Sequence, residues 1–135
     1  NLISDDQYNG VVFHRVIEGF MAQTGDVEFG NSNNKDFNLN IAGTGGSDLS
    51  DLNAEFSNAQ HVRGTVSMAR SQDPNSANSQ FFICFDDASH LDGQYTIWGQ
   101  VIEGMEFIDM IKKGTGANGS VSDPDKIIKM EIADQ

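Results

Sequence analysis

Short apolar runs alternate along this chain with loops rich in Gly, Asn, Ser and Asp, a pattern typical of a mainly β domain. The runs predict six strands, at residues 11–17, 20–24, 62–69, 80–85, 95–101 and 127–132. In the last of these, Ile128, Met130 and Ile132 alternate with charged residues. We expect residues 27–53 to form a long surface loop, and loops of that length in compact domains usually carry function.

One segment has helical spacing instead. Met105, Ile108 and Ile111 recur at three-residue steps, which places them on one face of a helix. Acidic residues lie at its start, lysines at its end, and Gly114 follows, an order that suits the helix dipole and a glycine cap. The sequence therefore predicts a helix near 104–113 in an otherwise β fold.

The length and charge exclude several classes of protein. The chain has 135 residues, enough for a single domain over 1–135, and 20 acidic against 8 basic side chains give a net charge of −12. That field disfavours nucleic acid and anionic membranes as partners. No apolar run is long enough to span a bilayer, and no secretion signal is visible, so we expect a cytoplasmic protein.

Candidate cofactor and metal motifs do not have the context they need. Residues 114–119 match G-x-G-x-x-G but follow the predicted helix, whereas dinucleotide binding needs a strand before the glycines and a helix after them. His14, His61 and His90 lack the spacing of metal ligands. Cys84 lies among Phe and Ile residues, as an inert core thiol does. We expect neither metal nor cofactor.

Polar residues inside apolar runs indicate where chemistry is located. Arg15 lies within an apolar strand, and Gln23 and Gln80 interrupt two others. An Arg and two Gln beside Phe and Met suggest an apolar pocket with a few fixed polar groups. The alternative is an Arg at a strand edge with its head group in water.

The segment 13–26, FHRVIEGFMAQTGD, resembles the central motif of the cyclophilins, a family of peptidyl-prolyl cis–trans isomerases. Residues 67–69, 79–83, 91–93 and 98–101 are similar to later motifs of that family, in the same order. The resemblance runs from about residue 8 to the end, and the sequence of residues 62–83 most resembles bacterial members of the family. It implies a closed antiparallel β-barrel, eight-stranded when complete.

In the family, two strands and most of a helix precede the first motif. The resemblance thus implies an N-terminally incomplete domain with about six strands. We expect an open barrel in which the strand near 127–132 lacks a partner on one side. One possibility left open is that these 135 residues do not fold alone.

The resemblance also assigns site residues. It implies that Arg15 is the catalytic arginine and that Gln23, with Gln80, bonds the substrate backbone. Substrate-binding positions are the walls of the proline pocket, the stretch beside the residue before proline, and the rim of a neighbouring pocket: Phe20, Met21, Phe82 and Leu91; Ala69 and Arg70; and Gly43. In the outer wall, His90 replaces the usual tryptophan and Tyr95 the usual histidine, and 27–42 is an insertion of unassigned role.

The resemblance implies an isomerase of X–Pro bonds that assists protein folding without a cofactor. Its partners would be proline-containing peptides and unfolded proteins, and the protein would be a monomer. Because of His90 and Tyr95, we expect weak binding of cyclosporin, the drug ligand of the family. The alternative is a proline-peptide binding module or chaperone without significant turnover.

Overall fold

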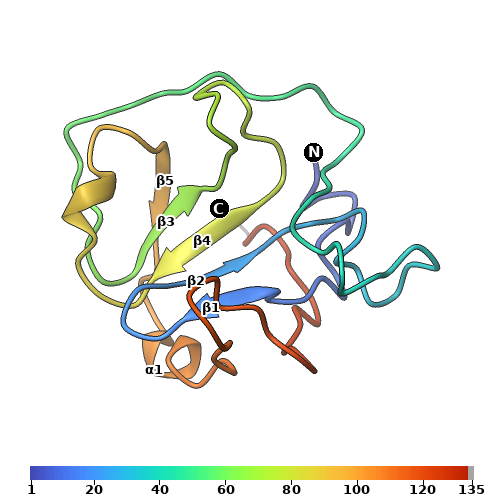
Figure 1. Ribbon diagram of the computed structural model, residues 1–135. Helices are drawn as coiled ribbons and strands as arrows, with labels where there is room; N and C mark the ends of the chain where they lie inside the picture. Colours follow the sequence, from blue (N-terminus) through green and yellow to red (C-terminus); the bar gives the residue numbers. More distant parts are fainter. Residues whose placement is uncertain (134–135) are drawn as a thin grey trace.

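The computed structural model describes residues 1–133 and has a single five-stranded sheet (Figure 1). The strands are β1 (Arg15–Ile17), β2 (Met21–Thr24), β3 (Thr65–Met68), β4 (Phe81–Cys84) and β5 (Ile97–Gln100). All neighbours are antiparallel, in the order β1-β2-β4-β3-β5. Two short helices, the 3-10 helix η1 (Ser89–Leu91) and α1 (Met105–Ile108), complete the elements, so the mainly β prediction is confirmed.

The central strand β4 explains where the site lies. Its four residues are all buried, and their side chains alternate between two faces of the sheet. Phe81 and Ile83 pack into one core cluster with Tyr8 and Val11. Phe82 and Cys84 pack into another, with residues of β2 and η1. The second cluster forms the inner wall of the candidate site.

The strand register brings three distant parts of the chain together. Arg15 on β1 pairs with Gln23 on β2, and Gln23 pairs with Phe82 on β4. Phe82 in turn pairs with Ser67 on β3. Because residues opposite one another in a sheet project to the same face, this row sets a cation and an amide beside an aromatic ring.

The predicted strand at 127–132 is wrong. Residues 127–133 are in no strand; the backbone of Ile127 hydrogen-bonds Gly10 and Val11, and a single bridge joins Val12 to Lys126. Alternation stabilises a strand only when one face is covered, whereas here Ile128 is 82% exposed. The sheet accordingly has five strands instead of about six. The barrel is not closed, as expected, and its edge strands are β1 and β5.

The predicted helix is shorter than its apolar spacing indicates. α1 ends at Ile108, and hydrogen-bonded turns continue the chain to Ile111. Met105, Ile108 and Ile111 nevertheless all pack against the core, so the predicted face is correct. Residues 27–53 form turns and bends, as expected of a surface loop. None of the helices formed by residues 1–133 has the length and apolarity needed to cross a membrane.

Candidate active site

The predicted pocket residues meet in a small cavity of about 130 Å³. Its inner wall is formed by Met21, Phe82 and Leu91, all nearly inaccessible to solvent. The cavity is lined by residues of β1, β2, β4, η1 and the loops between them: Arg15, Phe20, Met21, Gln23, Ala69, Arg70, Phe82, Leu91 and Tyr95. A cavity of this size suits one compact apolar side chain, since pockets for whole small molecules are several times larger.

Three polar side chains form a continuous hydrogen-bonded relay, which starts at Arg15 and Gln23 in this cavity and continues to Gln80 outside it. Arg15 donates from Nη1 to Oε1 of Gln23 at 3.1 Å, and Gln23 donates from Nε2 to Oε1 of Gln80 at 3.0 Å. Gln80 then donates to the carbonyl oxygens of Gly43 and Gly45, each at 2.9 Å. The relay fixes which end of each amide faces its neighbour.

The guanidinium of Arg15 is held at two points of its fork. Nε donates to the carbonyl oxygen of Asn118 at 2.9 Å, while Nη1 is bonded to Gln23. Among residues 1–133, no protein group accepts a hydrogen bond from Nη2 of Arg15. The side chain is therefore oriented by protein contacts and keeps one N–H edge available at the cavity.

The glycine end of the relay is anchored by Asp26, which the sequence analysis did not assign. Asp26 is fully buried, and its two carboxylate oxygens accept four backbone N–H bonds. Two of these come from Gly43 and Gly45. Gly43 has φ +102°, and a Cβ there would lie 2.9 Å from the His14 ring, so the position requires glycine. The signal was present, because Asp26 is the last residue of the first motif.

Tyr95 and His90, the two residues that differ from the resembled motifs, lie in different places. Tyr95 lines the cavity, with its ring edge-on to Phe82 at 6.0 Å and the guanidinium of Arg70 at 4.4 Å from its centroid. His90 does not line the cavity; it is exposed, and its ring lies 5.4 Å from that of Phe20. His90 thus reaches the site through Phe20.

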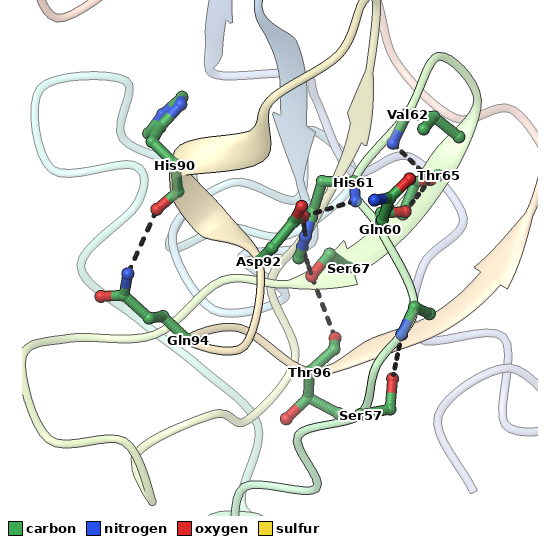
Figure 2. A network of polar contacts seen from close by, with 11 residues as sticks. Ser57, Gln60, His61, Val62, Thr65, Ser67, His90, Asp92, Gln94 and Thr96 are labelled. Carbon is green, nitrogen blue, oxygen red and sulfur yellow. Dashed lines mark hydrogen bonds and ion pairs between the residues drawn. The ribbon is translucent and has the colours of Figure 1, made fainter.

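His61, Asp92 and Ser67 form a polar network that the sequence analysis missed (Figure 2). The buried ring of His61 lies 3.0 Å from Oδ1 of Asp92 through Nδ1 and 2.9 Å from the Ser67 hydroxyl through Nε2. The Asp92 carboxylate also accepts the backbone N–H of His61, and these bonds hold the pKa of Asp92 below its ordinary value. No local sequence pattern around His61 predicts this contact, because its two residues are 31 positions apart.

This network supports Phe82 and Leu91, two residues of the inner wall of the cavity. The His61 ring stacks on Phe82 with centroids 6.2 Å apart, and Asp92 directly follows Leu91. Ser67 has no solvent exposure and its hydroxyl lies 3.0 Å from the carbonyl oxygen of Thr96. A serine buried in this way cannot meet a substrate, so the Ser–His–Asp set has a structural role and is not a nucleophilic triad.

Burial raises the pKa of the Cys84 thiol to about 11, which agrees with the expected inert core cysteine. In the part of the chain that the structure describes, no three His, Cys, Asp or Glu side chains are grouped to hold a metal ion.

Comparison with known proteins identifies the family. A model of the cyclophilin type peptidyl-prolyl cis-trans isomerase family matches residues 1–132. A probable peptidyl-prolyl cis-trans isomerase of Brucella abortus is 63% identical over 132 residues, covering 97% of this chain and 67% of the relative. A human peptidyl-prolyl cis-trans isomerase-like 3 is 41% identical over 113 residues, covering 83% and 64%. The chain belongs to the cyclophilin family.

Solved structures agree with this assignment. A cyclophilin of Cryptosporidium parvum, solved in the presence of the dipeptide Ala-Pro, has a TM-score of 0.80 at 27% identity and covers 99% of this chain and 81% of that one. The cyclophilin AquaCyp293 of Hirschia baltica has a TM-score of 0.75 at 24% identity, which supports the fold alone. This chain spans 61% of the Hirschia protein.

Proposed function

We propose that this protein accelerates cis–trans rotation about X–Pro peptide bonds, and that the cavity lined by Phe82 binds the proline ring (the proline pocket). The single observation that carries the proposal is the Arg15 guanidinium, held at the rim of this cavity with Nη2 unbonded among residues 1–133. The Ala-Pro dipeptide in the Cryptosporidium relative supports a proline-containing ligand.

Catalysis of this rotation requires a hydrogen-bond donor beside a pocket that holds the proline ring. Rotation about an X–Pro bond faces a barrier of about 20 kcal/mol, because amide resonance must be broken. In the twisted state the proline nitrogen becomes pyramidal and regains a lone pair. A donor aimed at that lone pair binds the twisted state better than either planar form and thereby lowers the barrier. Arg15 can supply that donor from Nη2.

The walls of the pocket would make this hydrogen bond stronger. Met21, Phe82 and Leu91 exclude water around the ring, and a charge-assisted bond gains strength in a low dielectric. The relay through Gln23 and Gln80 keeps the guanidinium oriented before the substrate arrives. Such preorganisation means that little reorganisation accompanies the rotation.

The substrates we propose are unfolded proteins and flexible peptides, in which the proline ring is accessible. The test is two-dimensional NMR exchange on an Ala-Ala-Pro-containing peptide, with the protein present at catalytic concentration. Exchange between the cis and trans signals should become much faster than the uncatalysed isomerisation, which takes tens to hundreds of seconds. Peptide binding without faster exchange would refute the proposal in favour of a binding module.

A further inference from the structure

Two asparagines of this chain, Asn9 and Asn118, are followed directly by glycine. Asparagine is among the thermally labile residues, and glycine after it gives the highest reactivity because no side chain hinders approach to the next backbone nitrogen. The structure places the two asparagines in different surroundings. Asn118 contacts the candidate active site, since its backbone carbonyl oxygen accepts the hydrogen bond from Nε of Arg15 at 2.9 Å.

Asn9 is restrained on both sides of its peptide bond to glycine. Its side-chain Oδ1 accepts the backbone N–H of Met130 at 2.9 Å. The nitrogen of Gly10, the group that would attack the Asn9 carboxamide, donates its hydrogen to the carbonyl oxygen of Ile127 at 2.6 Å. Because both reacting groups are engaged in hydrogen bonds, we expect Asn9 to be protected while the protein is folded.

Asn118 is less restrained. It is exposed, and its Nδ2 donates to the Ser120 hydroxyl at 3.3 Å, a bond that spans Gly119 and holds the carboxamide beside the backbone of that residue. The N–H of Gly119 donates to the carbonyl oxygen of Gly116 at 3.3 Å, which is longer than an ordinary hydrogen bond between amides. The two reacting groups are therefore more available here than at Asn9.

The reaction open to these groups is deamidation, with hydroxide and water as the only co-reactants. The Gly119 nitrogen loses its proton to hydroxide and forms a bond to Cγ of Asn118. The carboxamide nitrogen takes up a proton and leaves as ammonia, and a succinimide ring remains. Water then opens the ring. When the bond between the Gly119 nitrogen and the former backbone carbonyl carbon breaks, the product is isoaspartate, in which the chain runs through Cγ and that carbonyl becomes a free carboxylate.

The consequence of isoaspartate formation would fall on Arg15. The oxygen that now accepts the Nε hydrogen bond as part of a neutral carbonyl would belong to a carboxylate. A carboxylate binds a guanidinium through two parallel N–H bonds, and Nε and Nη2 form one edge of that fork. Nη2 is the donor assigned to the substrate nitrogen, so the new carboxylate would compete with the substrate for it.

We propose that Asn118 is a deamidation site, that it reacts faster than Asn9 in the folded protein, and that its conversion to isoaspartate places a carboxylate against the Nε–Nη2 edge of Arg15. The modification itself is independent of the proposed function. The loss of activity that should follow it rests on the proposed isomerase function.

The test of the modification is incubation of the purified protein at mildly alkaline pH, followed by peptide mapping with mass spectrometry. Isoaspartate is detected by methylation with protein isoaspartyl methyltransferase. We expect Asn118 to exchange NH₂ for OH roughly tenfold faster than Asn9, as the loss of one or two hydrogen bonds at Asn118 implies. In guanidinium chloride, which removes the protection of Asn9, the two rates should become similar.

The effect on Arg15 is measured by NMR exchange on the isoaspartate form after its separation by ion exchange. The matched control is freshly prepared Asn118→Asp, which carries the same added charge but keeps the backbone carbonyl in place. We expect kcat/KM of the isoaspartate form to be about tenfold lower than that of this control, because charge-assisted hydrogen bonds are roughly twice as strong as neutral ones. Asn118→Gln, which cannot form the five-membered ring, should keep its own initial activity throughout the incubation.

The possible failures are distinguishable. Conversion of Asn118 that is no faster than that of Asn9 in the folded protein would overturn the assignment of the modification site. Equal kcat/KM for the isoaspartate form and Asn118→Asp would overturn the effect on Arg15. Absence of turnover before any incubation would refute the proposed function, and the rates from mass spectrometry would still decide the modification.

Discussion

Replacement of Arg15 is the sharpest test of the chemistry, because the surroundings of this side chain are so well defined. Its Nε and Nη1 are bonded to Asn118 and Gln23, and the proposed role falls on the remaining N–H edge. Arg15→Ala removes the whole fork. Arg15→Lys keeps the charge but replaces the fork with a single ammonium, which cannot bond Gln23 and a substrate nitrogen in the same geometry.

The magnitude follows from the type of bond that is lost. A charge-assisted hydrogen bond made mainly in the transition state contributes about 2–4 kcal/mol. Its loss should lower kcat/KM by roughly 30- to 1000-fold in Arg15→Ala, with Arg15→Lys closer to the alanine variant than to the unmodified protein. Peptide affinity should fall much less, because the apolar walls at Met21 and Phe82 are unchanged.

NMR exchange gives turnover, and chemical-shift titration with the same peptide gives affinity. Arg63→Ala is the matched control, since Arg63 is an exposed arginine that is paired with Asp109 and does not line the proline pocket. Circular dichroism must first show that each variant is folded. A folded Arg15→Ala protein with kcat/KM close to that of the unmodified protein would refute the mechanism.

Three further predictions concern the histidines. Cyclosporin should bind the unmodified protein weakly and His90→Trp about 10- to 100-fold more tightly in titration calorimetry, because an indole restores a broad apolar contact; equal affinities would contradict the role given to His90. His61→Phe keeps an aromatic ring behind Phe82 but loses both side-chain hydrogen bonds, so the free energy of unfolding in urea should fall by about 1–3 kcal/mol, and an unchanged value would exclude the bracing role. The pKa of His14 is lowered from 6.5 to about 4 by burial, so the unfolded chain takes up the proton first and stability should fall by about 3 kcal/mol as pH drops from 6.5 to 4. A His14→Gln variant should lack this loss, and the same loss in that variant would contradict the assignment.

Local pattern predicted the central strands well because their side chains are buried by their immediate neighbours. Residues 20–24 and 80–85 contain β2 and β4, which pair directly with each other. The run at 127–132 has an equally clear alternation but no strand beside it, and alternation cannot reveal whether a partner exists. The helix predicted near 104–113 is shorter in the structure: α1 ends at Ile108, although Ile111 still packs against the core.

The proline pocket itself was predicted from motifs that hold most of its residues within short segments. Arg15, Phe20, Met21 and Gln23 all lie within nine residues of one another, and the register of β1 and β2 follows from their short connection. His61 and Asp26 were missed because their roles depend on partners far along the chain, at Asp92 and at Gly43. A single sequence does not show which distant loops meet.

The register also explains why the relay starts on β1. Arg15 and Gln23 are directly opposed on neighbouring strands, which places the two side chains on one face of the sheet. Gln80 lies just before β4 and is bonded to glycine carbonyls that Asp26 holds in place. A disturbance of the insertion 27–42 can therefore reach Arg15 through Gly43, Gln80 and Gln23, without any direct contact with the proline pocket. The insertion therefore affects the orientation of the guanidinium, and a disturbance of it should lower kcat for every peptide.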